Sequence, residues 1–233
     1  MNFKWTFQSF DTDFFGFKTA KIMDVTTNAV PDLLQDLKRN KINYASYRLL
    51  ANKFSIIHDL EKNGFILVDG TIALELNNYE TENKKFSKIR NATKDDISAL
   101  RKIARTIFIN TRFYADPVIP RRKAGELYAK WIENSVLGKA ADEVLVWEEN
   151  SKLLGFVTLQ KSGHIVLIGV NKSTQGKGIG RILIEASLPY FKRWKAQTVF
   201  LETQTTNIPA IRSYQSCGFK IVDSFLTFRW TDL

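Results

Sequence analysis

The stretch whose residue types and spacing are best suited to chemistry is Gln175-Gly176-Lys177-Gly178-Ile179-Gly180. It follows an apolar, β-branched run at 165–170, which predicts a buried strand. It leads into 179–194, where apolar residues recur on one side of an expected helix. The first N–H groups of a helix lack partners within it and carry partial positive charge. Glycines let such a backbone approach a phosphate closely, and Lys177 and Arg181 add charge, so the stretch favours an anion.

Two other phosphate loops are excluded by the spacing. A Walker loop would have Lys followed by Ser or Thr, and no such pair follows Gly180. A dinucleotide fingerprint requires a third glycine at an offset that G-x-G-x-G lacks. A different anion site and a purely structural turn between strand and helix are the alternatives that remain.

The segment from Val170 to Gly180 resembles the acetyl-CoA signature of the GCN5-related N-acetyltransferases, the GNAT superfamily. The pattern of that family is (Gln/Arg)-x-x-Gly-x-(Gly/Ala), and this chain fits it without a gap. The resemblance implies acetyl-CoA as co-substrate, with its pyrophosphate on the loop. It also implies two parallel strands, here ending at Val170 and Glu202, that splay apart to admit the pantetheine arm. Backbone groups of Ile168 and Val170 would then pair with the pantetheine amides.

Periodicity and turn residues predict an α/β chain with a mixed sheet. The expected strands are 3–7, 17–25, 42–50, one or two within 65–76, 144–148, 153–161, 165–170, 198–202, and one or more within 219–230. The expected helices are 31–40, 54–63, 95–110 with Thr93 as N-cap, 121–136, 179–194 and 207–217. A turn is expected at 11–16 and a loop at 111–120. The order of elements in 89–233 is similar to the GNAT fold.

A polar run without apolar periodicity, 77–88, is the best linker candidate. We therefore expect a smaller N-terminal α/β domain at 1–80 and a GNAT acetyltransferase domain at 81–233. Residues 57–69 and 211–223 are alike, since each has a helix, a glycine stop and an apolar strand. The first domain is interpreted as a degenerate GNAT-like copy that has lost the chemistry. The alternative is that both segments are the generic helix–glycine–strand unit.

Composition limits the class of protein. The 233 residues carry a formal net charge of +10, which suits acidic small molecules as well as nucleic acid. The basic residues are dispersed and no nucleic-acid motif is visible. One cysteine excludes a disulfide within the chain, and two histidines with it argue against a zinc site, so no metal is expected. No signal peptide and no apolar run of ~20 residues is visible, which predicts a soluble cytoplasmic protein without a membrane partner.

Two residues in the helix expected at 207–217 are candidates for the site. In the GNAT family an Asn at the place of Asn207 contacts coenzyme A, and a Tyr at the place of Tyr214 acts as general acid. The alternatives are a helix N-cap and a core tyrosine. A phenol with a pKa of about 10 is a weaker acid than a thiol with one of about 8.5, so full transfer would cost about 2 kcal/mol. Tyr214 is therefore expected to donate a hydrogen bond that completes as the C–S bond breaks.

The remaining catalytic groups are less well defined by the sequence. The Val170 N–H is the candidate donor to the oxyanion that forms during acyl transfer. The attacking amine must be neutral, and two bases are considered. His164 would act through water, with an exposed strand-end histidine as the alternative. Glu202 stands at the end of the other strand, with a surface or capping role as the alternative.

A closer resemblance concerns the acceptor. The segments TRFYADPVIP, YAKWIENSV and NIPAIRSYQSCGF resemble the enzymes that N-acetylate dTDP-4-amino-4,6-dideoxygalactose for surface polysaccharides. The likeness covers most of 110–230 and, more faintly, 1–76, where Phe14-Phe15-Gly16 recurs. It implies a nucleotide-linked amino sugar as acceptor and a homodimer. Arg112 would pair with the diphosphate, and Tyr114 or Phe113 would stack on the base, with packing beneath the loop as the alternative.

Three rival functions remain open from the sequence. Within the enzymes, the acceptor could be a protein N-terminus, a polyamine or an antibiotic. Outside them, the chain could be a non-catalytic acyl-CoA sensor or regulator, or a nucleic-acid binder because of its charge. An acceptor screen separates the enzymes from one another, and substitution of Tyr214 separates an enzyme from a regulator.

Overall fold

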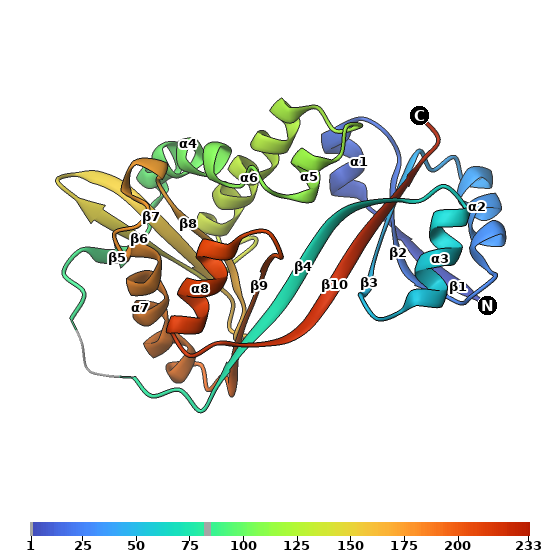
Figure 1. The fold of residues 1–233 in the computed structure, drawn as a ribbon. Coiled ribbons are helices and arrows are strands. Elements are labelled where there is room, and N and C mark those ends of the chain that lie inside the picture. The colour runs from blue at the N-terminus through green and yellow to red at the C-terminus, as the bar shows by residue number, and fades with distance from the viewer. Residues whose placement is uncertain (1, 82–84) are drawn as a thin grey trace. The chain divides into compact units, whose positions relative to one another are not determined.

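The computed structural model describes residues 2–81 and 85–233, and these form a mixed α/β structure (Figure 1). The chain folds into two compact units. Unit 1 consists of Met1–Thr71, Thr111–Ile119 and Asp223–Leu233, and unit 2 of Ile72–Asn110 and Pro120–Val222. The division at residue 80 stays a prediction, as does the degenerate copy. Part of the expected linker at 77–88 lies outside the described residues.

Unit 1 is a sheet with helices on it. Its strands lie in the order β1-β2-β3-β10, with β2 and β3 parallel and the other pairs antiparallel. Its elements are β1 (Phe3–Phe7), α1 (Ser9–Phe15), β2 (Thr19–Val25), α2 (Val30–Arg39), β3 (Tyr44–Leu50), α3 (Phe54–Lys62), α5 (Arg112–Ala115) and parts of β4 (Ile66–Asn77) and β10 (Lys220–Thr231). The segments at 65–76 and 219–230 thus form one strand each.

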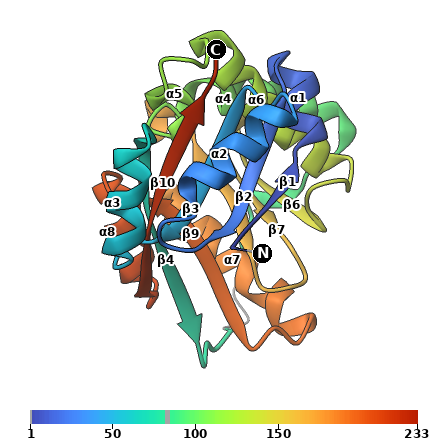
Figure 2. The ribbon, with the colours of Figure 1, turned by 90° about the vertical axis from the view of Figure 1, so that its right-hand side faces the viewer.

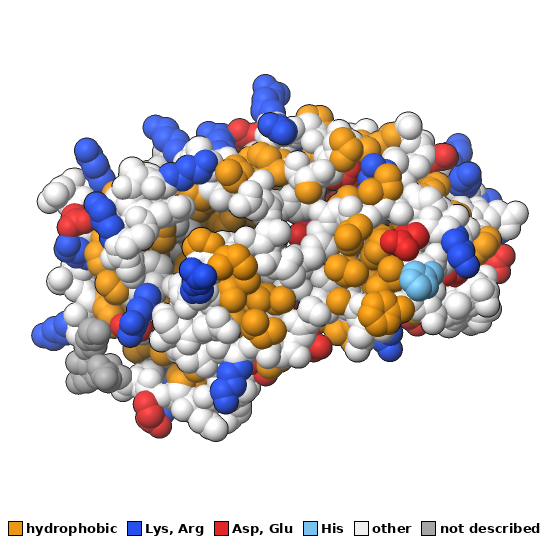
Figure 3. Space-filling view, in the orientation of Figure 1, with side chains coloured by type: hydrophobic (Ala, Val, Ile, Leu, Met, Phe, Trp, Pro, Cys, Tyr) orange, Lys and Arg blue, Asp and Glu red, His pale blue; other side chains and the backbone are white. Residues whose placement is uncertain are grey.

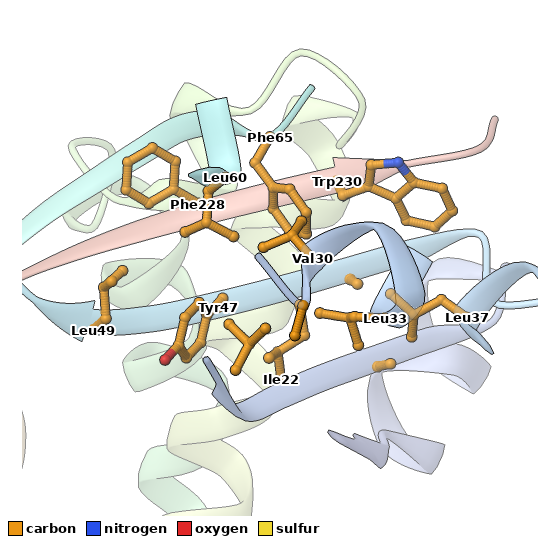
Figure 4. Close-up of a cluster of buried hydrophobic side chains, with 14 of the residues drawn as sticks. Ile22, Val30, Leu33, Leu37, Tyr47, Leu49, Leu60, Phe65, Phe228 and Trp230 are labelled. Carbon is orange, nitrogen blue, oxygen red and sulfur yellow. The ribbon is translucent and has the colours of Figure 1, made fainter. Parts of the chain in front are cut away.

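The core of unit 1 follows from the alternation of side chains along its strands. On β3, Ala45, Tyr47 and Leu49 are buried on the face that α2 and α3 cover (Figure 2). Figure 4 shows the cluster they join, with apolar side chains of α2 and Phe228 and Trp230 of β10. Each fully buried Leu or Val here contributes about 1.5–3 kcal/mol. The residues between them on β3 and β10 point to the opposite face.

Two expectations in unit 1 were wrong. Residues 11–16 were expected as a turn, but Ser9–Phe15 is helix α1, which ends where Gly16 adopts a φ of 82°. Residues 111–120 were expected as a loop, but Arg112–Ala115 forms the short helix α5. Phe15 of α1 stacks on Phe113 of α5 with ring centroids 6.0 Å apart. Both helices therefore rest on a tertiary contact, which local residue preferences do not reveal.

Unit 2 carries the sheet β5-β6-β7-β8, all antiparallel, and β9 beside β4. Ile179 and Leu183 of α7 approach one face at Gly155, and Ile107 of α4 approaches the other at Gly169. Its elements are β5 (Ile89–Asn91), α4 (Ile97–Ile107), α6 (Arg121–Val136), β6 (Glu143–Glu149), β7 (Lys152–Leu159), β8 (Ile165–Val170), α7 (Ile179–Arg193), β9 (Thr198–Gln204), α8 (Ile208–Ser216) and two 3-10 turns, Lys94–Asp96 and Lys172–Thr174. Thr93, the expected N-cap, precedes the first of these turns, and Asp96 accepts its N–H at 2.7 Å.

The strands β8 and β9 meet only at their beginnings. Each is the edge of a different sheet. Their one bridge in the described residues is parallel and joins His164 to Phe200, whose N–H donates to the Gly163 carbonyl at 2.9 Å. Toward Val170 and Gln204 the two strands do not pair, which is the splay that the resemblance implied. No helix in the described part of the chain is long and apolar enough to cross a membrane.

The junction of β8 and β9 requires a glycine at 163. Gly163 has a φ of +96°, and a Cβ there would lie 2.1 Å from the Thr198 carbonyl oxygen. We expect Gly163→Ala to lower the free energy of unfolding by about 3 kcal/mol, since strain and overpacking add. Gly138→Ala is the matched control, because Gly138 has a φ of +71° with nothing within 4 Å, and should cost about 1 kcal/mol. Equal losses in urea denaturation would contradict the close approach.

Candidate functional site

The outer edge of β8 presents backbone groups that the sheet does not use. Asn171 donates its N–H to the Leu154 carbonyl at 2.7 Å. Hydrogen-bonded and non-hydrogen-bonded residues alternate along an antiparallel pair, so Ile168 and Val170 turn their backbone groups away from β7. The Val170 carbonyl accepts a hydrogen bond from Gln175 Nε2 at 3.1 Å. The Val170 N–H and both groups of Ile168 remain directed at the edge where β8 has no neighbouring strand.

The loop after β8 leads into a helix start with open donors. Gly176 and Gly178 have φ values of 79° and 77°, and a Cβ on either would meet nothing within 4 Å. Gly178 is the N-cap of α7 and offers no side chain, and the first helical bond runs from Ile182 N–H to the Gly178 carbonyl at 3.1 Å. The N–H groups of residues 179–181 therefore have no intrahelical partner. Open N–H groups at a helix start suit an anion, and the binding of one by this loop stays a prediction.

Two basic side chains stand at this helix start. Lys177 is exposed, as is most of the Arg181 side chain. Arg181 Nε donates to Glu185 Oε1 at 2.8 Å, and this bond raises the pKa of the Arg181 guanidinium. Part of the Arg181 charge is thereby offset by its own helix, so the main-chain donors and Lys177 carry more of the attraction for an anion.

Tyr214 lies on α8 in the core of unit 2. It is 6% exposed, and its ring lies 6.2 Å from that of Phe219. Burial raises the pKa of the Tyr214 phenol, so the hydroxyl keeps its proton at neutral pH and can donate it in a hydrogen bond. Across residues 2–81 and 85–233, its hydroxyl makes no hydrogen bond. A purely structural buried tyrosine usually has a partner, so this one is available to a ligand.

Asn207 precedes α8 but does not cap it through its side chain. Instead its Nδ2 donates to Thr203 Oγ1 at 3.1 Å. Thr203 lies on β9 near its carboxyl end, where β9 and β8 no longer pair. The Asn207 amide is therefore held at the open end of the splay, as a role in contacting coenzyme A requires.

The two candidate bases lie in different places. His164 stacks on Phe200 with ring centroids 4.6 Å apart, at the closed end of the splay. Six residues of strand at about 3.3 Å each put it about 20 Å from Val170. Burial lowers the pKa of His164, which keeps the ring neutral. Its distance excludes His164 as a base beside Val170, whereas Glu202 lies exposed in the second half of β9.

The predicted acceptor residues, Arg112 and Tyr114, lie in unit 1 on α5. The guanidinium carbon of Arg112 lies 4.4 Å from the centroid of the Phe113 ring. Among the described residues Arg112 makes no ion pair within 4 Å and no side-chain hydrogen bond, so its donors are uncommitted. Phe113 is 9% exposed, which confirms packing beneath the segment rather than base stacking. Tyr114 is half-buried, and burial raises the pKa of its phenol.

A buried polar cluster holds this segment, and the sequence did not reveal it. Asp116 is 1% exposed and accepts hydrogen bonds from the Tyr44 hydroxyl at 2.9 Å and from the Val118 N–H at 3.1 Å. The Nε atom of Arg229 lies 3.2 Å from Oδ1 of the same Asp116 carboxylate. These partners come from β3 and β10, far away in sequence, so no local signal could have found them. The described residues contain no group of three or more His, Cys, Asp or Glu that could hold a metal ion.

Comparison with known proteins places this geometry in a family. A model of the acetyltransferase (GNAT) family matches residues 101–219, which include β8, the loop and Tyr214. Among solved structures, a conserved protein of unknown function from Staphylococcus epidermidis has a TM-score of 0.65 at 16% identity, covering 93% of this chain and 85% of that one. A GCN5-related N-acetyltransferase from Sphaerobacter thermophilus has a TM-score of 0.61 at 13% identity, covering 92% and 72%. Likeness at such identities shows the fold alone.

Three curated relatives are more similar in sequence. The dTDP-fucosamine acetyltransferase of Escherichia coli O6:H1 is 28% identical over 218 residues, 91% of this chain and 92% of its own. The spore coat polysaccharide biosynthesis protein SpsD of Bacillus subtilis is 29% identical over 133 residues, 56% of this chain and 46% of its own, so the match spans about half of that protein. An N-alpha-acetyltransferase of Saccharolobus solfataricus is 32% identical over 136 residues, 58% of this chain and 80% of its own.

The partly buried imidazole of His164 predicts a pH dependence of stability. Because its folded pKa is lowered, stability is fully present above the ordinary value of 6.5 and is lost as the pH falls through the folded pKa. We expect wild type to lose more stability than His164→Gln as the pH falls from 7.5 to 5.5, because only the unfolded imidazole then takes up a proton readily. Urea denaturation at both pH values measures it. His58→Gln changes the other, exposed histidine and should keep the wild-type dependence; the same slope in all three proteins would contradict the assignment.

Proposed function

The chain belongs to the GNAT acetyltransferase family, and on that premise we propose that it acetylates the amine of a nucleotide-linked amino sugar. The acceptor we propose resembles dTDP-4-amino-4,6-dideoxygalactose. The observation that carries the acetyl-transfer part is that unit 2 holds both open main-chain donors and Tyr214, a buried tyrosine whose hydroxyl has no hydrogen bond among the described residues.

The residues of unit 2 fit acetyl-CoA. The N–H groups at the start of α7, with open space beside Gly176 and Gly178, would hold the pyrophosphate. The free edge of β8 would pair with the pantetheine amides through both backbone groups of Ile168, while the N–H of Val170 would face the acetyl end of the same arm. Asn207, which is held by its hydrogen bond to Thr203, would hydrogen-bond to coenzyme A at the open end of the splay. When bound, acetyl-CoA supplies an acetyl group on a thiol leaving group.

Tyr214 and Val170 would stabilise the two charges that develop during transfer. The Val170 N–H, directed out of the sheet, would donate to the carbonyl oxygen that becomes negative as the amine attacks. The Tyr214 hydroxyl would donate to the departing sulfur, and its raised pKa favours hydrogen bonding over full proton loss. Of the two bases considered, Glu202 remains, because His164 lies at the closed end of the splay.

The choice of acceptor rests on the relatives and on Arg112. The dTDP-fucosamine acetyltransferase aligns over nearly the whole of both chains, and SpsD is named for polysaccharide biosynthesis. Arg112, with its donors uncommitted, would bind a diphosphate through charge-assisted hydrogen bonds. The homodimer implied by the resemblance belongs to the same proposal. Acetylation of a protein N-terminus is a second candidate, because the N-alpha-acetyltransferase is 32% identical over part of the chain.

A nucleic-acid role finds less support. On the face drawn in Figure 3, Lys and Arg side chains are scattered rather than gathered into one basic patch. A duplex or single strand is bound by a row of such charges along its phosphates. The net charge of +10 is better explained by attraction of two anionic small molecules, coenzyme A and a sugar nucleotide.

An acceptor screen tests the proposed function. The protein is incubated with acetyl-CoA and one amine at a time, and released thiol is measured. We expect turnover with a dTDP-linked 4-amino sugar and little with peptides or polyamines. Turnover of an N-terminal peptide and of no nucleotide amino sugar would overturn the sugar acceptor while leaving acetyl transfer in place.

Substitution of Tyr214 tests its role as donor. We expect Tyr214→Phe to lower kcat about 10²–10⁴-fold, because the leaving sulfur loses its donor, with the Kd for coenzyme A little changed. The matched control is Tyr190→Phe, which removes a hydroxyl that donates to Asn91 from the far end of α7. Initial rates and calorimetry separate the two effects. Wild-type kcat in Tyr214→Phe would instead favour a core tyrosine, whereas coenzyme A binding without turnover in the wild-type protein would favour a non-catalytic binder.

A further inference from the structure

A pair of stacked aromatic rings, one exposed and one half-buried, lies on α1 of unit 1. The rings of Phe10 and Phe14 have centroids 5.9 Å apart and planes 17° apart. The Phe10 side chain is 48% exposed, although burial of a phenyl ring would stabilise the folded protein. The resemblance noted for Phe14-Phe15-Gly16 did not explain this pair, and nothing in the proposed acetyl transfer uses it.

The pair continues into the segment that carries Arg112. Phe14 meets Phe15 edge-on with centroids 5.2 Å apart, and Phe15 stacks on Phe113 at 6.0 Å. The Arg112 guanidinium in turn lies over Phe113 at 4.4 Å. Each of these four rings therefore contacts the next, and the last one carries Arg112, so the exposed Phe10 and the Arg112 guanidinium belong to one set of contacts within unit 1.

Asp11 supports the same proximity. It lies on α1 between Phe10 and Phe14, and the charge of Arg112 lowers the pKa of its carboxyl while burial raises it more. Asp11 and Arg112 are thus close enough to interact, yet no ion pair within 4 Å joins them. The guanidinium is near α1 without being neutralised there.

The segment is held rigidly enough to present these groups. Asp116, which is buried in unit 1, accepts a hydrogen bond from the Tyr44 hydroxyl. Its Oδ1 atom lies 3.2 Å from Arg229 Nε. If the segment moved away, it would separate Asp116 from Arg229 and leave a buried charge without its partner. That separation is strongly unfavourable, so the segment has little freedom to move. A preformed site spends less of its binding free energy on ordering side chains.

We propose that Phe10 and Phe14 are the stacking platform for the base of a nucleoside diphosphate whose phosphates Arg112 binds. Every base has a π-face that stacks on an aromatic side chain, and a diphosphate is the anion that a guanidinium fork binds well. The inference rests on the proposed function, since it places the nucleotide half of the sugar acceptor on unit 1. Because phenyl stacking is tolerant of base identity, dTDP and UDP should bind with similar affinity.

Direct titration of the full-length protein with dTDP, without acetyl-CoA or sugar, tests the site by calorimetry. We expect Phe10→Ala to weaken dTDP about 10-fold and Arg112→Ala by a similar factor or more. Phe10→Trp keeps a stacking surface and should retain binding. The matched control is Phe54→Ala, which removes a phenyl ring that is 64% exposed elsewhere in unit 1 and should leave the Kd unchanged.

The outcomes distinguish this inference from the proposed function. If the dTDP-amino sugar is acetylated and dTDP binds, but Phe10→Ala and Phe54→Ala both keep the wild-type Kd, the platform is overturned and the function stands. If neither dTDP nor the amino sugar is recognised while another amine is acetylated, the sugar acceptor itself is overturned. A change of oligomeric state in Phe10→Ala, with unchanged Kd for dTDP, would show a contact between copies and would also overturn the platform.

Discussion

The parallel bridge between His164 and Phe200 determines which backbone groups of β8 are left for a ligand in unit 2. Parallel neighbours in a sheet normally satisfy each other's backbone groups along their whole length. Here the pairing stops after the first residues, so the amides of Ile168 and Val170 are left on the edge of β8 that faces away from β7. Leaving such groups without water or a hydrogen-bond partner costs free energy. They are suited to a ligand that is itself an extended chain of amides.

The two partners of the proposed reaction would be recognised by different kinds of group. Coenzyme A would be bound largely through main-chain donors, which most side-chain substitutions leave in place. The acceptor would be bound through side chains such as Arg112, which one substitution can remove. This difference agrees with the comparisons, in which this one chain is similar both to a protein named for a sugar and to one named for N-alpha acetylation.

Features set by neighbouring residues could be predicted from the sequence, and features set by distant contacts could not. The strand Ile165–Val170, the helix from Ile179 and the glycine loop between them are local patterns, and all were found. The helices α1 and α5 depend on the stacking of Phe15 on Phe113, and were missed. Asp116 gains its role from Tyr44 and Arg229, whose proximity only the fold creates. The choice between His164 and Glu202 likewise needed the geometry of the splay.

The order in which the strands occur along the chain has a consequence for biosynthesis. In unit 1, β10 pairs with β3, and Phe228 and Trp230 of β10 fill the core against α2 and α3. These residues leave the ribosome after all of unit 2, whereas domains are generally completed from the N-terminus onward. The first fifty residues are therefore synthesised before their apolar core can be completed. Their apolar side chains stay accessible to chaperones until β10 has been synthesised.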